Sequence, residues 1–139
     1  MKRFNTCSAL VGGALWLLGL VLAIPASAHH SVQAEFDMHK KVTVTGTVAK
    51  VEWINPHSYL TVDAKNADGK VERWAFELGG QGSLRKAGMS REDRGGLKPG
   101  DQVTVTALAA KDGSTTGHLQ ELTLPDGRVF KFGEDANGN

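Results

Sequence analysis

Apolar and polar residues alternate along residues 42–48, which read VTVTGTV. This period of two is typical of a β-strand that buries one face. The alternation returns at residues 58–64 and 71–78. Between these two stretches lies Asp68-Gly69, a pair that can adopt the positive φ angles of a tight hairpin. The sequence therefore predicts an all-β protein.

The first strand contains one irregularity. After residue 48, the next apolar pair, Val51 and Trp53, is out of step with the earlier alternation. One extra residue near Ala49-Lys50, a β-bulge, accounts for this shift. Asn55-Pro56 ends the strand, because proline has no N–H and restricts the residue before it.

Residues 79–100 interrupt the series of strands. Within them, Ser83 is a candidate cap for a short helix over residues 84–87. Alternation resumes at residues 102–109, and a last hairpin is expected over residues 118–132. Three strands, a short helix and two or three more strands is the order of the oligonucleotide/oligosaccharide-binding (OB) barrel. We expect a small OB-like barrel of five or six strands, with another small barrel or a sandwich as the alternative.

The beginning of the chain has the layout of a secretory signal peptide. A basic start, Met1-Lys2-Arg3, precedes an uncharged apolar run at residues 8–24, and Ala26-Ser27-Ala28 fits a signal-peptidase site. Cleavage between Ala28 and His29 would send the protein to the periplasm or outside the cell. The alternative is a retained membrane anchor, because about 17 apolar residues approach the length that spans a bilayer.

The domain organisation follows from these features. We expect no stable membrane insertion once the leader is removed. The expected segments are a signal peptide at 1–28, an amino-terminal arm at 29–41, an OB-like barrel at 42–133 and a disordered tail at 134–139.

Charge and cysteine content limit the possible functions of the processed chain. Loss of the leader removes two of the 16 basic residues and none of the 15 acidic ones, which leaves a net charge of −1. This balance gives no general attraction for nucleic acid or anionic membrane, so we expect no nucleic-acid partner. The only cysteine, Cys7, leaves with the leader, which excludes disulfides, thiolate metal sites and a cysteine nucleophile.

Two histidines stand directly behind the expected cleavage site. As residue one, His29 would offer a free amine and a ring nitrogen to one metal ion, and His30 could add its own ring. Nitrogen-rich sites of this kind suit Cu(II). His57, in the turn sequence EWINPH, is the best third ligand. We therefore consider copper as a possible cofactor held by His29, His30 and His57.

A plainer interpretation of the histidines stays open. His29 and His30 could form an unstructured stub, and the His57 ring could hydrogen-bond a neighbouring carbonyl in its turn. His39 and His118 are weaker ligand candidates, although His118 follows a loop that could face the same rim as His57.

Four residues are candidates for binding a non-metal ligand. Tyr59 and Arg73 fall on the strand faces opposite the expected core and could stack on or hydrogen-bond a sugar or peptide. Asn55 and Trp53 lie beside the same turn as His57; Trp53 fits the core, or lines a pocket if the register differs. These residues support the alternative function, a metal-free binding or assembly module for a peptide, glycan or envelope protein. No catalytic motif is present, so we expect no enzyme and assign no catalytic residue.

Several motifs together resemble one family of exported bacterial proteins. AHHS, EWINPH, LKPGDQVTV and LTLPDGR occur in the order seen in the family catalogued as domain of unknown function 6152. The resemblance implies an exported single domain and brings no established activity. His39 and His118 are not part of the family pattern, which falls here on His29, His30, Ser31, Phe36, Asp37, Gly46, Trp53, Asn55, Pro56, His57 and Trp74.

Overall fold

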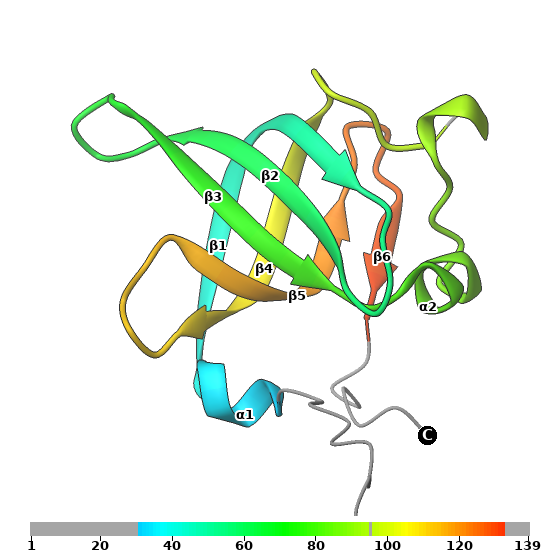
Figure 1. Ribbon diagram of the computed structural model, residues 1–139. Coiled ribbons are helices and arrows are strands. Elements are labelled where there is room, and N and C mark those ends of the chain that lie inside the picture. Colours follow the sequence, from blue (N-terminus) through cyan, green and yellow to red (C-terminus); the bar gives the residue numbers. More distant parts are fainter. Residues whose placement is uncertain (1–30, 95, 133–139) are drawn as a thin grey trace, which may run out of the picture.

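The computed structural model describes residues 31–94 and 96–132 (Figure 1). The expected signal peptide, its cleavage site at Ala28 and His29, the candidate ligand His30 and the expected tail lie outside the described residues. Within them, no helix is long and apolar enough to cross a membrane. In chain order the elements are α1 (Val32–Glu35), β1 (Phe36–Glu52), β2 (Ser58–Lys65), β3 (Val71–Leu78), α2 (Gln81–Lys86), the 3₁₀ turn η1 (Glu92–Arg94), β4 (Gln102–Ala110), β5 (Thr116–Thr123) and β6 (Val129–Lys131).

The strands form one closed sheet in the order β3-β2-β1-β4-β5-β6. Neighbours in that order are antiparallel, and the long, curved β1 pairs with both β2 and β4 (Figure 1). A parallel pairing of β3 with β5 closes the ring. With the short helix α2 between β3 and β4, this is the OB arrangement, and the expectation of a small all-β OB-like barrel is confirmed.

The core occupies the inside of the barrel and follows the alternation in the sequence. Leu60 and Val62 of β2, Phe76 of β3 and Val105 of β4 are fully buried there. Their neighbours in sequence point outward, as the period of two requires. The hydrophobic effect therefore selects one face of each strand and fixes its register.

The irregularity in the first strand is the predicted bulge. The β1–β2 register shifts between Val48 and Lys50, so Ala49 is the extra residue. Gly46 lies shortly before it, where β1 approaches β2 closely. A Cβ at Gly46 would stand 2.4 Å from the carbonyl oxygen of Asp63. The bend therefore needs a residue without a side chain at this position.

The prediction of an amino-terminal arm over residues 29–41 is partly wrong, because regular structure begins within that range. α1 begins at Val32 and β1 at Phe36, six residues ahead of the predicted start at Val42. The reason is a second, smaller apolar cluster in which Phe36 is buried against Leu108 and Ala110 of β4. This burial orders a segment whose composition is mostly polar.

The short helix also begins earlier than predicted, and Ser83 does not cap it. α2 starts at Gln81 behind Gly80, and no side chain of the capping position contributes a hydrogen bond. Instead the side chain of Asn55, from the β1–β2 loop, accepts a hydrogen bond from the backbone N–H of Gln81 at 3.0 Å. A residue far away in sequence thus satisfies one of the unpaired donors of the first helical turn.

We predict that Gly46→Ala destabilises the fold by about 1–3 kcal/mol, because the added methyl group would overlap the β2 backbone. Gly82→Ala is the matched control. No atom lies within 4 Å of a Cβ at Gly82, which is in α2, so alanine should stabilise the helix by about 0.5–1 kcal/mol. Urea unfolding of both variants measures the difference. Equal stability of the two would contradict the close approach of β1 to β2.

Candidate functional site

The β1–β2 loop places His57 against an acidic residue of β3. Nδ1 of His57 lies 2.8 Å from Oε1 of Glu77, and both side chains are only partly exposed. In the part of the chain that the structure describes, nothing is paired with the second ring nitrogen, Nε2. The carboxylate therefore fixes the orientation of the imidazole and leaves one nitrogen for a ligand.

Glu77 connects this histidine to two neighbouring strands. It is paired with Tyr59 across the antiparallel β2–β3 ladder and with His118 across the parallel β3–β5 ladder. We call the four residues His57, Tyr59, Glu77 and His118 the His57 cluster. It lies on the outer side of the barrel, because Phe76 and Leu78, the neighbours of Glu77, are buried in the core.

His118 is the buried member of the cluster. Its side of the barrel is covered by Phe36, whose ring centroid lies 5.6 Å from that of the imidazole. Nδ1 of His118 is 3.0 Å from the amide nitrogen of Gln120, also buried. The amide N–H donates to Nδ1, so the neutral ring carries its proton on Nε2.

These surroundings shift the pKa values of two side chains of the cluster, His118 and Tyr59. Burial, and secondly the charge of His57, lowers the pKa of His118. Burial raises the pKa of Tyr59, with smaller contributions from the carboxylates of Glu77, Glu35 and Glu52. The cluster is therefore one electrostatic unit, in which burial favours the neutral forms of His118 and Tyr59 and the charges of His57 and Glu77 act on these two neighbours.

The cluster on its own is not a complete metal site. Among residues 31–94 and 96–132, no three His, Cys, Asp or Glu side chains are arranged to hold a metal ion. A metal bound by His57 would need ligands from elsewhere in the chain. His39 is exposed on β1, and its backbone N–H donates to the Asp37 side chain.

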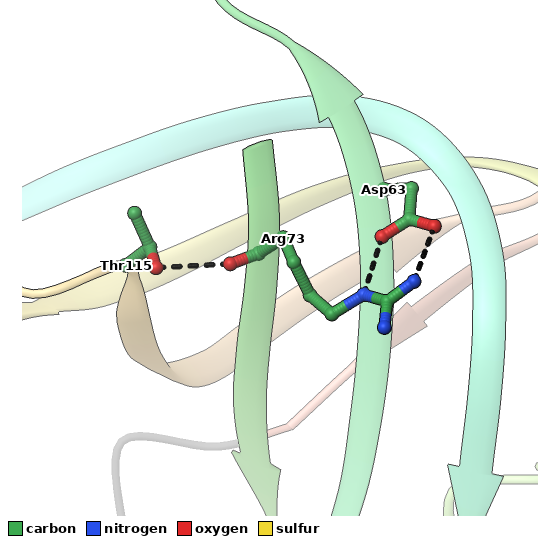
Figure 2. Close-up of polar contacts among 3 residues, drawn as sticks. All are labelled: Asp63, Arg73 and Thr115. Atoms are coloured by element: carbon green, nitrogen blue, oxygen red, sulfur yellow. Dashed lines mark hydrogen bonds and ion pairs between the residues drawn. The ribbon is translucent and has the colours of Figure 1, made fainter. Parts of the chain in front are cut away.

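Arg73, predicted as a ligand-binding residue, is engaged elsewhere. Figure 2 shows its guanidinium donating two hydrogen bonds to Asp63, at 2.7 and 2.9 Å, while Thr115 donates to its backbone carbonyl. Hydrogen bonding to the Arg73 side chain lowers the pKa of Asp63. Along β3, Arg73 is four residues from Glu77, or about 13 Å. It lies on the outer face, as expected, but is separate from the His57 cluster, and its role in binding stays a prediction.

Trp53 and Asn55 face α2 rather than the cluster. The carbonyl of Trp53 accepts a hydrogen bond from the side chain of Gln81 at 2.8 Å, and Asn55 accepts one from the Gln81 backbone. Trp53 is half-buried, packs against the core and also lines a cavity beside the helix. Of the four residues proposed for a non-metal ligand, Tyr59 alone lies in the His57 cluster.

Sequence reasoning missed Glu77 and undervalued His118. In the alternating strand over residues 71–78 nothing distinguishes Glu77 from an ordinary surface charge, and His118 follows a loop as a weaker ligand candidate. Their meeting depends on the parallel β3–β5 register, for which the sequence carries no local signal. The order of an OB barrel, which places the third strand beside the fifth, is the one clue that could have paired them.

Comparison with known proteins identifies a family. The model of the family of unknown function DUF6152 matches residues 18–120, about three quarters of the chain. The chain belongs to this family. The resemblance based on AHHS, EWINPH and the later motifs is thereby confirmed. A search of curated proteins gives no sequence match.

Solved structures with a similar fold include two crystal structures of the mitochondrial single-stranded DNA binding protein Rim1 from S. cerevisiae. Each is 13% identical to this chain and covers 64% of it and 97% of its own length, with TM-scores of 0.46 and 0.45. At this level the likeness concerns the fold alone. Both are structures of a single-stranded DNA binding protein, which contradicts our expectation of no nucleic-acid partner. We withdraw that expectation and assign no nucleic-acid binding to this chain.

We predict that His118 makes the stability of the protein depend on pH. Because its pKa is lower in the folded state, the unfolded chain binds the proton more tightly, and stability rises with pH. The contribution is complete above the ordinary histidine pKa of about 6.5 and is lost as the pH falls below it. Urea unfolding between pH 7.5 and 5 should show a smaller loss of stability in His118→Leu than in the unmodified protein.

The matched control for this experiment is His39→Leu, which changes an exposed histidine. It should retain the pH dependence of the unmodified protein. An identical slope for all three proteins would show that His118 does not lose a proton on folding.

Proposed function

We propose that this protein is an exported, non-catalytic binding module that takes up Cu(II), with His57 as the ligand in the barrel and His29 and His30 as ligands at the processed amino terminus. The observation that carries the proposal is the His57–Glu77 pair. A histidine that ligates a metal commonly donates its other ring N–H to a carboxylate, which fixes the tautomer and makes the ligating nitrogen more basic. Glu77 supplies such a partner at Nδ1, and Nε2 would be the ligand.

The position of α1 supports the participation of the amino terminus. Phe36, the first residue of β1, packs on His118, so the amino-terminal segment joins the barrel beside the His57 cluster. The four residues of α1 rise about 6 Å, and three further residues to His29 add at most about 11 Å. A tether of this length keeps residues 29 and 30 within about 17 Å of the start of β1.

Export supplies the remaining ligand chemistry. Signal-peptidase cleavage between Ala28 and His29 would create an α-amine next to an imidazole, and such an amine is partly deprotonated near neutral pH. Amine, imidazole and backbone amide nitrogens are ligands that favour Cu(II) over the other divalent ions of its series. In this proposal, export to the periplasm both locates the protein and creates the α-amine that completes its metal site.

We predict stoichiometric Cu(II) binding by protein purified from the periplasm with His29 as its first residue. One additional alanine before His29 should weaken binding at least tenfold, because it removes the amine from the chelate. His57→Ala should weaken it by a similar factor because it removes the barrel ligand. Isothermal titration with CuCl₂ in a non-chelating buffer measures both effects.

His39→Ala is the control, since His39 is exposed on β1 and is not a proposed ligand. It should bind as the unmodified protein does. Equal affinity with and without the extra alanine would overturn the terminal chelate. Equal affinity of His57→Ala would reduce the site to a binding motif of the amino terminus alone and overturn the role of the barrel.

A further inference from the structure

A second candidate site lies on the α2 side of the barrel, apart from the His57 cluster. Here the end of β1, the helix α2 and the segment that follows it enclose a cavity of about 120 Å³. Trp53, Gln81 and Met89 line it together with three arginines, Arg85, Arg91 and Arg94. The cavity therefore combines an aromatic wall with a concentration of positive charge.

The wall is held in place by the surrounding structure. Met89 is buried, and Trp53 packs against the core. Gln81 fixes the two sides relative to each other: its side chain donates to the carbonyl of Trp53, and its backbone N–H donates to Asn55 of the same loop. A ligand would thus find a preformed surface, which lowers the entropy cost of binding.

The three guanidinium groups lack strong counter-charges within the described residues. No carboxylate lies within ion-pair distance of Arg85 or Arg94 there, and Arg91 approaches Asp93 only to 4.0 Å. No acidic residue lines the cavity. Three like charges around one concavity repel each other, and an anion between them would relieve that repulsion.

We propose that this cavity binds a small organic carboxylate that carries a planar ring. The guanidinium groups match the geometry of a carboxylate, to which arginine can donate two parallel hydrogen bonds. The ring would stack against Trp53 and Met89. The volume fits this class: an engineered protein cavity of about 150 Å³ binds benzene, so about 120 Å³ with an open, charged rim accommodates one ring and little more.

This inference does not depend on the proposed copper site, because the two share no ligand. Trp53 and His57 flank the same loop, but Trp53 contacts α2 whereas His57 contacts β3. A protein that fails to bind Cu(II) could still bind a carboxylate, and the reverse also holds.

The test uses benzoate as the probe, with isothermal titration calorimetry of protein purified in its exported form. We expect benzoate to bind, and acetate, benzyl alcohol and inorganic phosphate to bind at least tenfold more weakly. Acetate and phosphate lack the ring, and benzyl alcohol lacks the charge. Phosphate that binds as tightly as benzoate would overturn the proposal in favour of an unspecific anion site.

Variants locate the binding within the molecule. Replacing Arg85, Arg91 and Arg94 together by glutamine should weaken benzoate binding at least tenfold, and Trp53→Leu should weaken it similarly. Lys86→Gln is the control for charge, because it removes one positive charge from α2, the helix that carries Arg85, at a position that does not line the cavity. Urea unfolding checks that each variant is folded; the three arginines are exposed and should tolerate the change. Benzoate affinity that is unchanged in the triple variant, or reduced equally by Lys86→Gln, would refute the site.

Discussion

The parallel pairing of β3 with β5 is the constraint on which the rest of the structure depends. It turns an open sheet into a closed barrel and leaves the core without an exposed side. Gly117 makes it possible. A Cβ there would stand 2.9 Å from the Cβ of Ala107 and 3.2 Å from the ring of Phe76. A larger residue would push β5 away from its neighbours, and the strand edges would lose their hydrogen bonds.

The same closure creates the His57 cluster. Glu77 and His118 meet because the β3–β5 register places them opposite each other, and the β1–β2 loop then lays His57 against Glu77. Phe36 covers His118 from the beginning of β1. One backbone interaction therefore supports the core, the carboxylate–histidine pair and the burial that lowers the pKa of His118.

The sequence predicted the barrel well where the signal was local. The strand alternation, the turn at Asp68-Gly69 and the bulge at Ala49 each depend on neighbouring residues, and all three are found. Prediction failed where distant contacts outweigh local preference. β1 begins early because Phe36 is buried against β4, and α2 begins early because Asn55, from another loop, satisfies its first turn.

By itself the sequence determined the fold class and the order of strands and short helix along the chain, since periodicity and turn chemistry act over a few residues. Only the tertiary structure decided which side chains meet. It placed His57 against Glu77, paired Arg73 with Asp63 and put Trp53 in the lining of the cavity beside α2. The physical reason is that contacts between strands depend on register and closure, which the packing of the whole core selects and no short segment encodes.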